Sequence, residues 1–101
     1  MKQCCKDYLT EQFGDEEVVN EIYAEYVRSI QEKLPGIEDA VATENWTALD
    51  QLAHAVKGNA LATGDNDVAN VAVALRAAAK MSEKDTSESL LKKMKELAAG
   101  I

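Results

Sequence analysis

Residues 45–64 read NWTALDQLAHAVKGNALATG, and this stretch has the pattern of one complete amphipathic helix. Asn45 is a favoured residue type for a helix N-cap, and Gly64 is the type that most often takes the left-handed conformation just after a helix. Between them, apolar residues recur at steps of three and four, which places them on one helical face. That face consists of Leu49, Leu52, Ala53, Val56 and Ala60. Because one helix cannot bury its apolar face alone, the stretch predicts a helix packed against others.

The residues before this stretch carry the same periodicity over a longer span. Asp15, Glu16 and Glu17 place negative charge where the dipole of a starting helix favours it. The apolar stripe that follows consists of Val19, Ile22, Tyr23, Tyr26, Ile30, Leu34, Ile37 and Val41. It keeps its phase through Pro35-Gly36, so the pattern predicts one helix bent at the proline rather than two helices.

Two further segments follow Gly64. Asp65-Asn66-Asp67 is expected to cap a helix whose apolar face is Val68, Val71, Ala72, Leu75 and Ala79. Asp85 and Glu88 have the spacing of a capping box and precede a face made of Leu90, Leu91, Met94, Leu97 and Ala98. Four amphipathic helices with short connections predict an all-α fold, an antiparallel four-helix bundle. Residues 4–12 are a candidate for a short extra helix at the N-terminus, with Tyr8 and Leu9 as its apolar contacts.

Length and charge limit the classes of protein to which this chain could belong. With 101 residues, of which 47% are hydrophobic and 29% charged, the chain is expected to form a single domain, residues 1–101. Acidic residues outnumber basic ones by 18 to 11, and a net charge of −7 argues against binding to nucleic acid or to anionic membranes. The longest apolar run, Val71–Leu75, is too short to span a membrane, and the first residues lack the apolar core of a secretory signal. We therefore expect a cytoplasmic protein, and a monomer.

The cysteine content argues against a disulfide or a metal site. Cys4 and Cys5 are adjacent, so a bond between them would close a strained ring, and we expect two reduced thiols. Two cysteines and the single His54 offer too few ligands at suitable spacing for a metal ion, so no metal is expected on this chain.

His54 is predicted to point into solvent. At about 100° per residue, it lies roughly 150° from the centre of the apolar face of its helix. Asp50, Gly58 and Leu61 lie within about 40° of His54, and Lys57 lies about 60° away. Gly58 is notable because glycine inside a helix costs about 1 kcal/mol relative to alanine. An exposed imidazole beside a bare patch, with a cation one turn along, suits attack on a bulky phosphorylated partner, although an idle surface histidine has the same spacing.

His54, Lys57, Gly58 and Gly64 together resemble the His-x-x-Lys-Gly-x-x-x-x-x-Gly signature of histidine-containing phosphotransfer (HPt) domains. The run from Asn45 to Ala53 is also similar to that family's approach to its histidine, and the resemblance extends over about residues 15–99. Two positions depart from the family pattern. Asp65 follows Gly64 where a small residue is usual, and Arg76 stands where an acidic residue is frequent.

The resemblance implies a phosphorelay intermediate. His54 would accept a phosphoryl group from a phospho-aspartyl receiver domain, or from a hybrid sensor histidine kinase, and pass it to another response-regulator receiver. Lys57 would offset the charge of the phosphoryl group, and Gly58, Leu61 and Asp50 would form the docking surface. The chain would need no cofactor, because Mg²⁺ is supplied by the partner receiver domain.

Several features bear on how such a site would work. There is no glycine-rich phosphate loop and no kinase nucleotide motif, so we expect a phosphoryl carrier rather than an enzyme that uses ATP. Asp50 lies one turn before His54, and we hypothesise that it accepts a hydrogen bond from the ring. Two other functions remain open: a helical adaptor that binds partners without being phosphorylated, and a hydrolase using Asp50 and His54 as a base pair. The hydrolase lacks a nucleophile at matched spacing.

Overall fold

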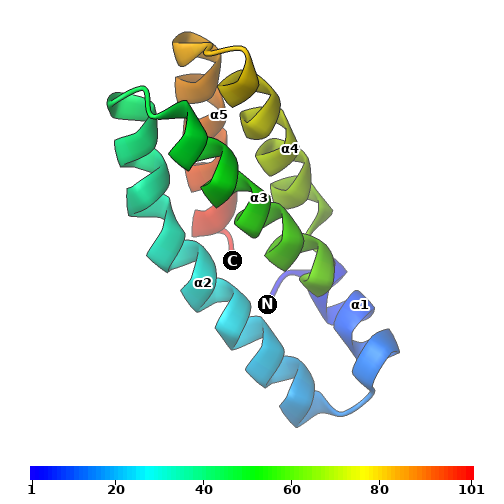
Figure 1. Ribbon diagram of the computed structural model, residues 1–101. Coiled ribbons are helices and arrows are strands. Elements are labelled where there is room, and N and C mark those ends of the chain that lie inside the picture. Colours follow the sequence, from blue (N-terminus) through cyan, green and yellow to red (C-terminus); the bar gives the residue numbers. More distant parts are fainter.

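The computed structural model describes all 101 residues, which form five helices joined by short connections (Figure 1). The helices are α1 (Gln3–Phe13), α2 (Glu16–Ala42), α3 (Trp46–Thr63), α4 (Asn66–Lys80) and α5 (Lys84–Ala99). In Figure 1, α2 to α5 run lengthwise beside one another, and α1 lies at the end of the bundle where α2 begins and α3 ends. Helix α3 packs against α2 and α4, while α5 packs against α4 and α2 and closes the ring. The predicted all-α bundle, with the additional N-terminal helix, is confirmed.

The predicted apolar faces form the core. The α3 residues Leu49, Ala53, Val56 and Ala60 are buried, whereas Leu52 is only half-buried. All five residues of the predicted α4 face are buried, and Met94 of α5 is fully enclosed. One cluster of 20 buried residues joins contributions from all five helices. None of the helices combines the length and apolar character needed to cross a lipid bilayer.

Helix α2 continues without interruption through Pro35, as the unbroken phase of its apolar stripe predicted. Its N-cap is Asp15, whose carboxylate accepts a hydrogen bond from the backbone N–H of Glu17 at 2.9 Å. Within the same helix Gly36 allows close approach to α3, because a Cβ there would lie 3.2 Å from a methyl carbon of Leu52.

The start of α5 differs from the prediction. Its N-cap is Glu83, not Asp85, and no side chain caps its first backbone N–H groups. The chain turns at Ser82, which has a φ of 53°, and the helix therefore begins two residues earlier than the capping-box spacing indicated. Asp85 then lies in the first turn, where its charge still favours the helix dipole.

Helix α1 was placed well by the sequence, but one of its two contacts was wrong. Leu9 is fully buried, whereas the Tyr8 side chain remains 36% exposed and Cys5 takes the second core position. Tyr8 instead lies over the Gly64 turn, where a Cβ would come within 2.5 Å of the Tyr8 Cβ. Because Gly64 also has a φ of 80°, the turn after α3 needs glycine both for its backbone and for the approach of α1.

The two cysteines are free thiols, as expected, but their surroundings differ. Cys4 is exposed and Cys5 is buried, with their sulfur atoms 4.0 Å apart. Burial, reinforced by the neighbouring Cys4, raises the pKa of the Cys5 thiol to about 12. Cys5 is therefore protonated at neutral pH and acts as a core residue rather than a nucleophile.

A buried carboxylate ties α1 to the bundle. Asp65 is completely buried, and both of its oxygens accept hydrogen bonds from the Lys2 ammonium at 3.0 Å. The Tyr26 hydroxyl donates to the same carboxylate at 2.7 Å, and the backbone N–H of Val68 donates at 3.4 Å. Asp65 thus caps α4 as predicted and also anchors the N-terminus, which gives this departure from the family pattern a structural role.

Replacing Lys2 with methionine is expected to lower the free energy of unfolding by about 2 kcal/mol. Removing one partner of a fully buried ion pair costs about 3–5 kcal/mol. The cost here is smaller because the Lys2 side chain is 16% exposed. Denaturant unfolding measures the change.

Two companion variants make the measurement specific. Combining Lys2→Met with Asp65→Asn removes the unpaired charge and should recover most of the loss. Lys95→Met breaks the exposed Lys95–Glu38 pair and should change stability by less than about 0.5 kcal/mol. If Lys2→Met and Lys95→Met lowered the free energy of unfolding equally, the Lys2–Asp65 pair would not act as a buried anchor of the N-terminus.

Candidate functional site

The rotational setting of α3 is fixed at both ends and along one side. The Asn45 side-chain oxygen accepts a hydrogen bond from the backbone N–H of Ala48 at 3.2 Å, which confirms the predicted N-cap. At the other end, the backbone N–H of Asp65 donates to the Ala60 carbonyl at 2.9 Å around the left-handed Gly64. Between them, the Asn59 amide donates to the Ser29 hydroxyl of α2 at 2.8 Å. The exposed face of α3 therefore has a defined direction.

His54 lies on that exposed face, as its helical phase predicted. Its neighbours Ala53 and Val56 are directed into the core and are fully buried. The Arg76 side chain of α4 reaches the imidazole, with Nη1 2.9 Å from Nδ1 of His54. The other ring nitrogen, Nε2, makes no hydrogen bond within the protein, and the residue is exposed.

The Asp50 carboxylate makes no hydrogen bond to the His54 ring, which corrects the hypothesis that it accepts one from the imidazole. The Asp50 carboxylate instead accepts a hydrogen bond from Nε of Arg76 at 3.0 Å. Arg76 stands between Asp50 and His54 because its guanidinium presents donors on more than one edge. This arrangement also removes the direct Asp50–His54 pair on which the hydrolase hypothesis depended.

Arg76 is the residue of this site that sequence reasoning passed over. In the sequence Arg76 stands out only as a departure from the family pattern. The available signal was its position directly after Leu75, at the flank of the buried α4 face, where a long side chain can reach a neighbouring helix. Its partners could not be identified without the α3–α4 register.

The remaining predicted site residues share the exposed face with His54. Lys57 is half-buried, and its ammonium belongs to none of the ion pairs in the structure. Gly58 faces open space, since a Cβ there would meet nothing within 4 Å. Leu61 is 48% exposed. The face thus combines a free cation, a position without a side chain and an apolar side chain.

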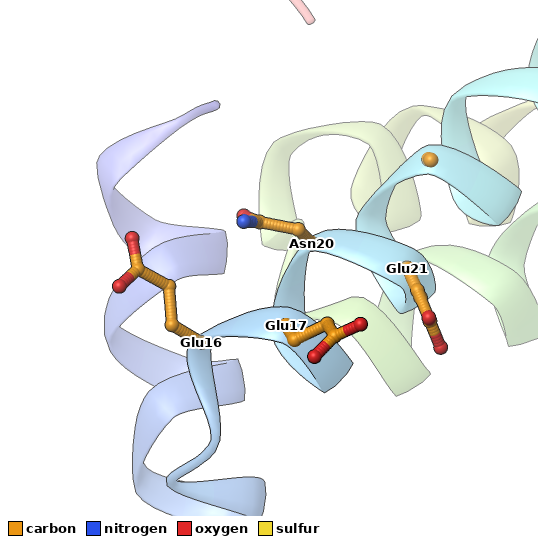
Figure 2. A pocket seen from close by; sticks show the side chains of 5 residues that line it. Glu16, Glu17, Asn20 and Glu21 are labelled. Carbon is orange, nitrogen blue, oxygen red and sulfur yellow. The ribbon is translucent and has the colours of Figure 1, made fainter.

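His54 lines none of the hollows of the surface. One is formed at the start of α2 by Glu16, Glu17, Asn20, Glu21 and Ala24. Figure 2 shows that the labelled side chains of this hollow spread to both sides of the helix instead of converging, and three of them are acidic. A shallow hollow beside Asp50 includes Lys80 and Trp46. No three His, Cys, Asp or Glu side chains are grouped so that they could hold a metal ion.

An exposed histidine on an open helix face is therefore accessible to another macromolecule. Because His54 lines no hollow of its own chain, any reaction at His54 would be enclosed by the surface of that partner. The Lys57 ammonium adds positive potential to this face of an acidic protein. Such an arrangement suits a residue that is modified by a partner protein rather than one that binds a small substrate in a cavity.

Comparison with known proteins gives a family. The family model described as Hpt domain matches residues 21–101, which include α3, α4 and α5 and most of α2. Searches among curated proteins and among solved structures give no match. The matched region contains His54 and every other residue of the exposed face described above, while α1 lies outside it.

Membership of this family carries a phosphocarrier role in phosphorelays and interaction with receiver and kinase partners in general. The helical bundle and the sequence signature agree with the match. The chain belongs to the Hpt domain family, the histidine phosphotransfer modules of two-component signalling.

Proposed function

We propose that His54 is the phosphoacceptor, and that it takes a phosphoryl group from a phospho-aspartyl receiver domain and passes it to another response-regulator receiver. The observation that carries this proposal is the exposure of His54, the only histidine of the chain, on an open face of α3. Around it lie a free lysine and a helix position that has no side chain.

The proposed transfer needs only the imidazole and the partner's acyl phosphate. A ring nitrogen with a free lone pair attacks phosphorus while the bond from phosphorus to the aspartyl oxygen breaks. The electron pair of that bond leaves with the aspartate carboxylate, and the ring releases its extra proton to solvent. Transfer to the next receiver is the same exchange in reverse, and Mg²⁺ is expected on the receiver domains.

Lys57 assists by balancing charge on the transferred group. At about 4 Å, a lysine ammonium and a phosphoryl oxygen attract each other by ~1 kcal/mol in water and by ~4 kcal/mol at an effective dielectric constant of 20. Gly58 lets the backbone of a partner loop approach His54, and Leu61 offers apolar contact. Asp50 contributes through Arg76, whose guanidinium it holds.

The proposal is tested by mixing the purified protein with a receiver domain that carries a labelled phosphoryl group. We expect acid-labile, alkali-stable label to appear on this chain and to move onward when a second, unphosphorylated receiver is added. A stable complex without transfer of label would favour the adaptor function and overturn the proposal. Release of inorganic phosphate with no labelled chain at any time would also contradict a carrier.

Replacing Lys57 with alanine is expected to slow transfer from the receiver roughly five- to fiftyfold without abolishing it, because one partly screened charge is removed. Raising the ionic strength should slow the wild-type protein and narrow the difference between the two, since salt screens the same attraction. Rapid-quench measurements of label transfer give both rates.

Lys92→Ala, at an exposed position of α5, is the matched control and should transfer at the wild-type rate. Complete loss of transfer in Lys57→Ala would make this lysine indispensable for docking or chemistry. An unchanged rate would return Lys57 to an ordinary surface residue.

A further inference from the structure

Arg76 contacts His54 in a way that constrains the protons of the ring. A guanidinium group has only N–H donors and stays protonated in proteins, so it cannot accept a hydrogen bond. With Nη1 of Arg76 2.9 Å from Nδ1 of His54, the Nδ1 atom must be the acceptor and must present its lone pair. The neutral ring therefore carries its proton on Nε2.

Nδ1 has no room for a phosphoryl group while Arg76 is in place. Nε2 lies on the far side of the ring, on the exposed face of α3. A phosphoryl group on this histidine is therefore placed on Nε2. In that phosphorylated ring Nε2 is occupied and Nδ1 again has a free lone pair, which is the state that Arg76 stabilises.

We propose that Arg76 keeps Nδ1 of the phosphorylated His54 unprotonated and thereby protects the phosphoryl group from hydrolysis. This inference rests on the proposed role of His54 as phosphoacceptor. In hydrolysis, a water oxygen bonds to phosphorus and the water releases a proton to solvent, while the P–N bond breaks and its electron pair returns to Nε2. A proton on Nδ1 lets the ring leave as neutral imidazole, whereas an unprotonated ring must leave as the much more basic imidazolate. Arg76 occupies the position of that proton.

Asp50 and α4 hold Arg76 in this position. Its Nε donates to Asp50 at 3.0 Å, and its side chain is only 25% exposed. The other charged groups of this region are Lys57 of α3 and Lys80 of α4, which lies beside Asp50. Helix α2 meets the opposite flank of α3 through Ser29 and Asn59, and α1 meets α3 at Gly64. The surroundings of Nδ1 are therefore dominated by Arg76.

The same contact affects loading of the phosphoryl group. Attack by Nε2 requires its lone pair, so the ring proton must first move to Nδ1, and this breaks the hydrogen bond from Arg76. Loading therefore takes place while Arg76 is away from the ring, whether the donor is a docked receiver or a small molecule. Arg76 thus stabilises the unphosphorylated ring with its proton on Nε2 and the ring phosphorylated on Nε2. It disfavours the form with a proton on Nδ1, through which the ring is loaded.

The test uses phosphoramidate, a small donor that needs no docking surface, on the full-length protein and on Arg76→Ala. After the donor is removed, ³¹P NMR follows the loss of phosphohistidine between pH 6 and pH 8. We expect Arg76→Ala to lose its phosphoryl group roughly tenfold faster near neutral pH, the factor that corresponds to the loss of one hydrogen bond from a charged donor. The difference should shrink toward alkaline pH, where the ring is unprotonated in both proteins.

Three further variants separate this role from a structural one. Arg76→Lys retains a group that can only donate and should restore part of the protection. Asp50→Asn loosens the anchor of Arg76 and should give an intermediate rate. Arg28→Ala removes an arginine from an exposed ion pair on α2 and should behave as wild type. In the unphosphorylated proteins, ¹⁵N NMR should find the Nε2–H form of neutral His54 in wild type and a shift toward Nδ1–H in Arg76→Ala.

The outcomes distinguish this inference from the proposed function. Equal rates of phosphohistidine loss in wild type and Arg76→Ala at every pH overturn the protective role and leave His54 as the phosphoacceptor. A wild-type His54 that takes no phosphoryl group from phosphoramidate or from a receiver overturns the proposed function itself. A wild-type ring found as Nδ1–H by ¹⁵N NMR contradicts the contact on which the protection depends.

Discussion

Replacing His54 with glutamine is expected to abolish phosphoryl labelling by a receiver while leaving thermal unfolding nearly unchanged. The His54 side chain is exposed, and its contact within the protein is the hydrogen bond with Arg76. Surface substitutions of this kind change stability by no more than about 0.5 kcal/mol. Glutamine keeps a polar side chain on the helix but has no nitrogen with a nucleophilic lone pair.

The control for this variant is Gln51→Ala, which removes an exposed polar side chain from the same helix. It should be labelled as wild type is. Undiminished label on His54→Gln would show that another residue carries the phosphoryl group. Alkali-labile label would indicate an acyl phosphate on a carboxylate instead of a phosphohistidine.

Gly58→Leu is expected to impair phosphoryl transfer from a receiver domain but not labelling by the small donor phosphoramidate. A side chain at position 58 enters open space, because nothing lies within 4 Å of the Cβ position. The bundle should therefore stay folded. Leucine would occupy the space that a partner backbone needs beside His54, so transfer from a receiver should fall by at least an order of magnitude. Labelling by phosphoramidate should persist.

Gly58→Ala serves as the graded control. It should raise the free energy of unfolding by up to ~1 kcal/mol, since alanine favours the helix and restricts the unfolded chain. Thermal unfolding and both labelling reactions are measured on the same preparations. Unfolding of Gly58→Leu would mean that the glycine is a packing residue, and receiver transfer at the wild-type rate would place the docking surface elsewhere.

The parts of this structure that the sequence predicted are those fixed by local chemistry. Asn45 and Gly64 act at the ends of α3 through their own backbone and side-chain preferences, so residue type and spacing were sufficient. The outward direction of His54 followed from the same helical phase. Pro35 left α2 continuous because the apolar stripe on either side is buried in one core.

The contacts that could not be predicted join residues in or next to different helices, so they depend on how those helices are aligned against one another. Arg76 and Asp50 are 26 residues apart, and Lys2 and Asp65 are 63 apart, so neither pair has a local signature. Asp65 was expected to cap α4, but its complete burial could not be predicted without placing the N-terminal segment at that end of the bundle. Asp85 was wrong as a cap because the turn at Ser82 starts α5 two residues earlier.

These unpredicted contacts affect the candidate site more than the fold. Spacing alone made Asp50 a partner of the His54 ring, since the two residues are one helical turn apart. The structure places a guanidinium between them, which exchanges a hydrogen-bond acceptor at Nδ1 for a donor. The residue that meets the ring from α4 is therefore a donor, which favours the ring form with its proton on Nε2.

The most direct test of the central claim is to locate the phosphoryl group after transfer from a phosphorylated receiver. The wild-type protein is incubated with the labelled receiver, kept at alkaline pH and analysed by ³¹P NMR and by peptide mapping. We predict one phosphoryl group per chain, bonded to a ring nitrogen of His54. A labelled chain in which His54 is unmodified, or no transfer from receivers that readily label another Hpt domain, would contradict it.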